Sequence, residues 1–249
     1  MVLDIVTANP REALSAAIAD CYRVFPGKLK VPVGVCPCCV DEDDAKLLSS
    51  RPRQSIPANT LEQYTHSAHG PGTENEFQYF LPRYFELISM CDFPSHSVEI
   101  TLSRLGEHDW RSWRKESELI EQVLMLIFST SLLSTEGLGK EDIGEVVIML
   151  LLGGASTDLL YSGLSTAVES SEPSVYVPIA TRFADLAINE IQGHRLANAF
   201  WRNSRKMEAD ISELLHSNTF AEFLAVMIER TDDQRLVEKL DMAFSMAFA

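Results

Sequence analysis

Apolar residues recur at helical spacing along almost the whole chain, and this periodicity limits the fold more than any other feature. The clearest case is residues 110–130, whose apolar positions lie three and four residues apart: Leu119, Ile120, Val123, Leu124, Ile127 and Phe128. Such spacing places apolar side chains on one face of an α-helix. No stretch alternates strictly between apolar and polar residues over more than about four positions, as a half-buried strand would. The sequence therefore predicts an all-α protein, either an irregular multi-helix bundle or a helical-repeat-like stack.

Capping and helix-breaking residues set the predicted helix boundaries. Asn9 can cap a helix whose first turn contains Pro10 and Glu12, and this helix should end at Phe25. Pro82 is expected to kink or split a helix over residues 73–90. Further helices are predicted at about 41–48, 60–68, 97–105, 140–152, 155–169, 178–200, 205–216, 219–229 and 232–247. The apolar face of the last one is predicted to hold Leu236, Val237, Leu240, Phe244 and Met246.

The chain is long enough for one large domain or two small ones. It has 249 residues, 46% of them hydrophobic, which excludes a disordered chain. The segment Ser129–Lys140 has the composition of a linker. We expect an N-terminal helical part with a cysteine-rich loop over residues 1–130 and an acidic helical part over residues 131–249, packed as one globular unit.

The formal net charge of −15 is unevenly distributed. Residues 1–115 contain 15 acids and 12 bases, whereas residues 116–249 contain 21 acids and 9 bases. A negative field of this kind repels nucleic acid and anionic lipid and speeds encounter with a basic partner. The same charge also keeps a protein soluble, which is the simpler interpretation. The predicted partner-binding residues are Glu208, Asp210, Glu213, Glu222, Asp232 and Asp233.

Several features predict a cytoplasmic location. The first residues lack the basic and apolar regions of a secretory signal peptide. The longest apolar stretch, Val146 to Ala155, is shorter than the roughly 20 residues that span a bilayer. The cysteine count is odd and three cysteines crowd into four positions, so reduced thiols are expected. The five are Cys21, Cys36, Cys38, Cys39 and Cys91.

The segment Cys36-Pro37-Cys38-Cys39 contains a C-x-x-C pattern, which is half of a common zinc-ligand set. A zinc site would use Cys36, Cys39, His66 and His69, with Cys91 or His96 as other candidate ligands. A redox motif is a further interpretation, although the strand–helix context of thioredoxin-like sites is missing. The simplest alternative is a packed loop in which three reduced thiols act as small hydrophobic groups.

Complete catalytic motifs are missing from the sequence. No Ser/His/Asp elbow, phosphate-binding loop or Rossmann glycine pattern occurs, and Gly153-Gly154 does not follow a predicted strand. The run Asp41–Asp44 lacks the alternating ligands of a calcium loop and is better explained as an acidic first helical turn. The segment Trp110–Arg114 could stack a nucleobase or form a protein contact, but indoles packed in the core are the favoured reading. A protein without enzymatic activity or cofactor is therefore predicted.

Part of the chain resembles an uncharacterised bacterial family. Its pattern is a C-x-x-C, an acidic helix and a phrase close to HFLPR-x-LEL. Matching positions here are Cys36, Cys39, Lys46–Ser49, Leu61, Tyr64, Ala68, Phe77, Phe80–Arg83, Glu86, Leu87, Trp110, Trp113 and Leu240–Phe244. The chain departs from the pattern at Tyr79, where the family has a histidine, and by having His66 and His69.

Acidic helical proteins of this kind are similar to immunity proteins encoded beside bacterial toxins, notably effectors of type VI secretion systems. This similarity implies an inhibitor that binds and neutralises a cognate toxin. A nuclease toxin would fit, because nucleases need basic clefts to hold phosphates. A zinc-binding structural or enzymatic helical domain and a helical adaptor protein remain the alternative predictions.

Overall fold

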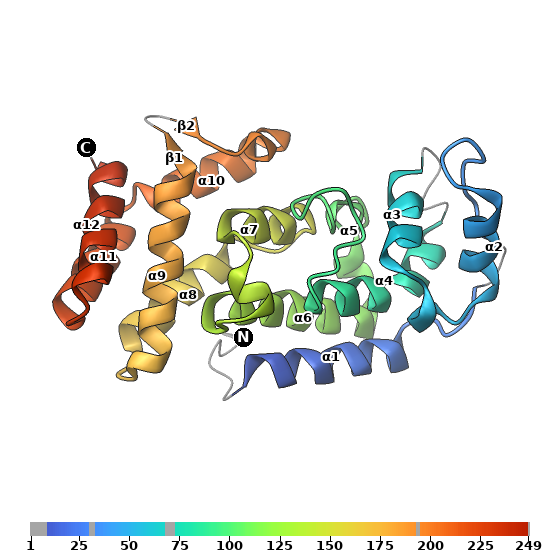
Figure 1. The fold of residues 1–249 in the computed structure, drawn as a ribbon, viewed down its shortest axis with the longest axis horizontal. Helices are drawn as coiled ribbons and strands as arrows, with labels where there is room; N and C mark the ends of the chain where they lie inside the picture. Colours follow the sequence, from blue (N-terminus) through green and yellow to red (C-terminus); the bar gives the residue numbers. More distant parts are fainter. Residues whose placement is uncertain (1–8, 30–32, 68–72, 193–194, 249) are drawn as a thin grey trace.

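The computed structural model describes residues 9–29, 33–67, 73–192 and 195–248. Within these ranges the chain forms twelve α-helices, four short 3-10 helices and one antiparallel pair of two-residue strands, which confirms the all-α prediction (Figure 1). The α-helices are α1 (Pro10–Val24), α2 (Glu42–Ser50), α3 (Ala58–His66), α4 (Glu74–Ser89), α5 (Ser103–Gly106), α6 (Arg114–Leu133), α7 (Ile143–Leu152), α8 (Asp158–Glu169), α9 (Pro173–Glu190), α10 (Arg205–Leu215), α11 (Asn218–Arg230) and α12 (Gln234–Phe248). The short elements are η1 (Arg53–Ser55), η2 (Trp110–Ser112), η3 (Gly137–Lys140), η4 (Ala199–Asn203), β1 (Ile191–Gln192) and β2 (Arg195–Leu196).

Helix α6 lies at the centre of the molecule and joins its two ends (Figure 1). It packs along α1 on one side and contacts α7, α8 and α9 on the other. Its inward face buries Ile120, Val123, Ile127 and Phe128, as the periodicity predicts. The expected linker does not separate two bodies, because Ser129 to Leu133 form the last turns of α6 and most of them are buried.

At the N-terminal end, α1 packs on α4, α3 contacts α4 through Tyr64 and Phe80, and α2 packs on α3 (Figure 1). Asn9 caps α1 as predicted, its side chain accepting a hydrogen bond from the backbone N–H of Glu12. Helix α4 continues through Pro82 without being split, because this proline lies in a fully packed stretch. Tertiary burial offsets the lost backbone hydrogen bond there.

The buried Arg53 holds this end together. Its guanidinium donates to the carbonyl oxygens of Tyr22 (2.8 Å), Pro26 (2.6 Å) and Tyr79 (3.0 Å). These carbonyls belong to the end of α1, the loop after it and the middle of α4. One side chain therefore fixes η1 against two helices.

At the C-terminal end, α8, α11 and α12 pack around α9 (Figure 1). The buried face of α12 is Leu236, Leu240, Ala243 and Ala247. Phe244, predicted to lie on that face, is 40% exposed. The prediction for Phe244 was wrong because Ala243 and Ala247 form the contact instead. Their small side chains let α12 approach its neighbours closely, and Phe244 lies at the edge of that contact.

The helix predicted over residues 178–200 has different bounds in the structure. It begins at Pro173, in the first turn where proline is tolerated, and it ends at Glu190. Beyond it, Ile191 pairs with Leu196 and Gln192 with Arg195 in the strand pair. No described helix is long and apolar enough to cross a bilayer; the apolar stretch of α7 is buried inside the protein.

Candidate functional site

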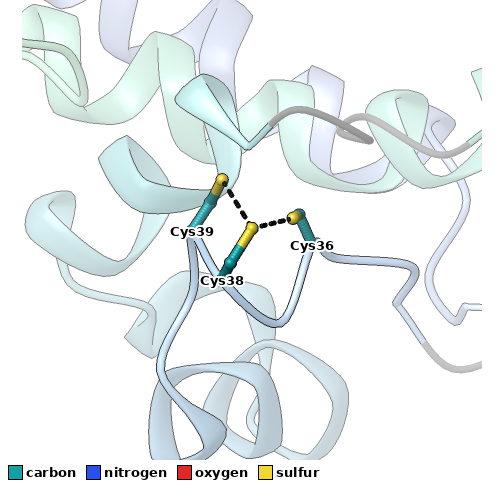
Figure 2. A group of neighbouring side chains, drawn as sticks. All are labelled: Cys36, Cys38 and Cys39. Atoms are coloured by element: carbon teal, nitrogen blue, oxygen red, sulfur yellow. Dashed lines mark hydrogen bonds between the residues drawn. The ribbon is translucent and has the colours of Figure 1, made fainter.

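The three neighbouring cysteines form a tight turn that brings their sulfur atoms together (Figure 2). The backbone N–H of Cys39 donates to the carbonyl of Cys36 at 2.9 Å, so residues 36–39 make a β-turn. Pro37 occupies the second position, where its fixed φ angle suits such turns. The Sγ atoms of Cys36 and Cys38 are 2.8 Å apart, and those of Cys38 and Cys39 are 3.8 Å apart.

This turn is anchored on α3. The backbone N–H of Cys36 donates to the Ser67 hydroxyl at 2.9 Å, directly after the last residue of the helix. Val40, the next residue after the turn, is buried in the core. Because the turn is attached at both ends, the relative positions of the three thiols are set by the fold.

The three thiols differ in exposure and acidity. Cys36 is buried, whereas Cys38 and Cys39 are exposed, and all three are free thiols. Hydrogen bonding from the Cys38 thiol, aided by the Cys38 backbone N–H, lowers the pKa of the Cys36 thiol. The reciprocal bonds to Cys36 and Cys39 raise the pKa of Cys38 to about 11. The first thiolate of the cluster is therefore favoured at Cys36.

The predicted zinc ligands separate into two groups. His66 pairs with His96, the Nε2 and Nδ1 atoms lying 3.0 Å apart, and Glu62 joins this pair. None of these three belongs to the group of sulfur atoms. His69 lies outside the described residues. Burial, followed by the charge of His96, lowers the pKa of His66, so one neutral imidazole can donate to the other. That hydrogen bond accounts for the pair without a metal ion.

The structure divides the predicted partner-binding residues between two places. Glu208, Asp210 and Glu213 lie on α10, which precedes α11, and Asp210 is paired with Lys206 at 2.7 Å. The other three lie on α11 and in the turn that follows it: Glu222, Asp232 and Asp233. The two sets therefore lie on different elements of the chain.

A second acidic segment joins the set on α11. Arg230 donates to the carbonyl oxygens of Ala167 (3.2 Å), Val168 (2.8 Å) and Ser170, and its guanidinium lies 4.6 Å from the centre of the Tyr176 ring. These contacts hold the end of α11 against the connection between α8 and α9, at the lower left of Figure 1. We call the six exposed carboxylates of α11, the turn after it and the α8–α9 connection the acidic face: Glu169, Glu172, Glu222, Glu229, Asp232 and Asp233.

The acidic face has little compensating positive charge. None of its members forms an ion pair with another described residue. The same segments, 169–172 and 222–235, contain only the bases Arg230 and Arg235. Arg230 already donates to backbone carbonyls, so six negative charges stand against two positive ones and the face projects a negative potential.

A groove of about 240 Å³ lies beside these acids, between α8 and α11. Its lining is apolar at the base and acidic at the edge, and includes Leu164, Val168, Phe223, Val226, Glu169 and Glu222. Sequence reasoning did not find Glu169, because two helices, α9 and α10, separate it from α11 along the chain and only the packing of α8 on α11 and the Arg230 contacts bring it there.

The two indoles of the aromatic and basic segment lie in the core and its arginines are exposed, as the favoured interpretation predicts. Trp110 and Trp113 are buried, and the Trp110 Nε1–H donates to the carbonyl of Gly153 at 3.1 Å. Gly154 has a φ of +88°, and a Cβ there would lie 2.8 Å from Trp110 Nε1, so the glycine allows this close approach. A pocket of about 400 Å³ lies next to Trp110 and Arg111.

Glu190 is a buried carboxylate that no sequence pattern marked. It accepts hydrogen bonds from Trp201 Nε1 (2.6 Å) and from the backbone N–H of Asn198 (3.2 Å). Burial raises its pKa despite these bonds, and the charges of Asp142 and Glu99 act in the same direction. Glu190 thus organises the segment after α9 rather than contributing to the acidic face.

Comparison of the chain with protein-family models, curated proteins and solved structures finds no match. No residue role can therefore be transferred from a relative. The geometry and charge of the described residues carry the functional inference.

Proposed function

We propose that this protein is an immunity-type inhibitor that binds and neutralises a cognate bacterial toxin through the acidic face. The observation that supports it best is the convergence of six exposed, unpaired carboxylates from two parts of the chain beside an apolar groove. The role needs no catalysis, in line with the missing motifs, and it is exercised in the cytoplasm.

Charge complementarity gives the physical reason for this role. A nuclease toxin holds phosphates in a basic cleft, and an inhibitor with a negative face is attracted to that cleft over distances up to the Debye length, about 10 Å at 0.1 M salt. Attraction of this kind raises association rates and discourages acidic partners. Rapid capture is what protection from a toxin requires.

The apolar groove supplies the short-range part of binding. Interface energy is concentrated in a few buried side chains surrounded by a polar rim. Leu164 and Phe223 can provide the floor for an apolar side chain of the partner, while Glu169 and Glu222 can pair with basic residues beside it. The expected partner segment therefore combines an aliphatic or aromatic residue with flanking arginines or lysines.

The test uses the product of a toxin gene that neighbours the coding sequence. The two purified proteins should form a stable complex, and the inhibitor should abolish toxin activity at equal concentration. A double reversal in the acidic face, Glu222→Lys with Glu229→Lys, should weaken the complex by about 100-fold or more, since each lost charge contact at an interface costs on the order of 1–3 kcal/mol.

The matched control is Glu118→Lys with Glu121→Lys, which reverses two exposed acids on α6 and changes the net charge equally. This variant should bind nearly as tightly as the wild-type protein. Equal weakening by both double variants would show that net charge alone acts and would contradict the acidic face as the site. Failure to bind the toxin, with repeated recovery of an unrelated protein, would favour the adaptor alternative.

A further inference from the structure

The cysteine turn contains a feature that toxin binding does not use. Three thiols lie with all their sulfur atoms within 4.8 Å of one another. The closest pair, Cys36 and Cys38, is separated by 2.8 Å, whereas a disulfide bond measures about 2.05 Å. Weak hydrogen bonds between thiols, two of them exposed, add little to stability, so the arrangement calls for a chemical explanation.

The spacing of the Cys38 and Cys39 sulfur atoms matches that of metal-bound thiolates. With metal–sulfur bonds of about 2.3 Å, tetrahedral or trigonal geometry places two sulfur ligands roughly 3.8–4.0 Å apart. Cys38 and Cys39 are already 3.8 Å apart. The pair Cys36 and Cys38 would have to open by about 1 Å, which a small χ1 rotation of the exposed Cys38 provides.

The surroundings of the turn favour a soft cation. The group contains sulfur ligands only, and no imidazole or carboxylate of the described residues belongs to it. Thiolates select zinc and cuprous copper over magnesium or calcium. Helix α2 begins at Glu42, shortly after the turn, and its exposed acids Glu42 and Asp43 share a single base, Lys46, so this end of the helix keeps a net negative charge that attracts cations.

We propose that Cys36, Cys38 and Cys39 together bind one thiophilic metal ion, Zn²⁺ or Cu⁺, through three thiolates. This assignment replaces the ligand set with His66 and His69 by one that includes Cys38. Binding releases the thiol protons, so affinity rises with pH. Because the turn is hydrogen-bonded to Ser67, the ion stiffens the connection between the loop and α3.

The experiment uses the full-length, untagged protein, reduced and freed of metal. Zn²⁺ and Cu⁺ are titrated separately in competition with a chromophoric chelator, and Cd²⁺ serves as a probe through its thiolate charge-transfer absorption in the ultraviolet. We expect one ion per chain, and the preferred metal follows from comparing the two titrations. Cys38→Ser and Cys39→Ser should each weaken binding by about 100-fold or more, beyond the 10–100-fold cost of losing an outer-shell partner.

Two control variants make the result specific. Cys91→Ser removes a thiol outside the group, and His66→Ala removes the imidazole of the earlier prediction; both should bind metal as the wild type does. Cys38 and Cys39 are exposed, so their serine variants should fold normally, as circular dichroism will verify. The proposal is overturned if no stoichiometric ion binds, if Cys38→Ser has no effect, or if the isolated protein carries a Cys36–Cys39 or Cys36–Cys38 disulfide in place of metal.

Discussion

The cysteine turn and the acidic face bring their functional groups together in different ways. The turn gathers three thiols within four residues, through one β-turn and one anchoring hydrogen bond to Ser67. The acidic face gathers carboxylates separated by more than fifty residues, through helix packing and the contacts of Arg230. Local clustering can be read from a sequence, whereas clustering by tertiary structure requires the fold.

The N-terminal and C-terminal ends of the molecule nevertheless share one structural device. In each, one arginine donates to three backbone carbonyls: Arg53 in the N-terminal region and Arg230 in the C-terminal region. Arg53 is 4% exposed, whereas Arg230 is partly exposed. If both arginines stabilise their ends of the molecule, replacing the more buried Arg53 should lower the free energy of unfolding more than replacing Arg230.

Arg53→Met should have the largest effect. It leaves three carbonyls without their donor in a buried place, and we expect a loss of about 3–5 kcal/mol in the free energy of unfolding, the range for breaking a buried charged network. Chemical denaturation followed by circular dichroism measures it. A loss below about 1 kcal/mol, the net value of an ordinary hydrogen bond, would show that the N-terminal region does not depend on this arginine.

Arg230→Met should have a smaller effect, about 1–3 kcal/mol, because water can reach part of the site and replace the lost donors. Hydrogen exchange should increase at the end of α11 and in the α8–α9 connection, with no change around the cysteine turn. If exchange rises equally at both ends of the molecule, the two regions are not independently held and the comparison fails.

Glu190 gives a prediction on pH. Its pKa is raised in the folded protein, so the folded state holds this proton more tightly than the unfolded chain does. The resulting stability is present below the unfolded pKa, about 4.3, and is lost as pH rises through the folded value. Glu190→Gln keeps an acceptor for Trp201 and removes the charge. The free energy of unfolding of this variant, minus that of the wild type, should therefore increase as the pH is raised from 4 to 7. A difference that does not change with pH would contradict the raised pKa of Glu190.

The fold was largely predictable because local signals and packing agree. The Asn9 cap and the periodicity of residues 110–130 give helices that the structure confirms, although α6 begins only at Arg114. The first residues of that segment form a 3-10 turn because Trp110 bonds to Gly153, a contact distant in sequence. Likewise, the helix predicted over residues 178–200 ends at Glu190 in the structure. The hydrogen bonds that Glu190 accepts from Asn198 and Trp201 hold the following residues in a non-helical conformation.

The candidate sites were predictable only in part. The sequence predicted Cys36 and Cys39 as metal ligands but not Cys38. The reason is that the C-x-x-C pattern counts only its first and last cysteines as ligands. The sequence assigned His66 to the thiols, whereas the fold pairs it with His96. Glu222, Asp232 and Asp233 were recognised as acids, yet Glu169 and Glu172 come from another segment, which the packing of α8 on α11 and the Arg230 contacts bring beside them.

The association rate of the protein with its neighbouring toxin, measured by stopped flow between about 50 mM and 500 mM salt, tests the role of the acidic face most directly. Screening should lower the rate constant of the wild-type protein and of the α6 control by about tenfold or more over this range. The variant Glu222→Lys with Glu229→Lys should start slower and respond much less to salt. Rates that do not depend on salt, or a salt response that the two reversals leave unchanged, would contradict binding through the acidic face.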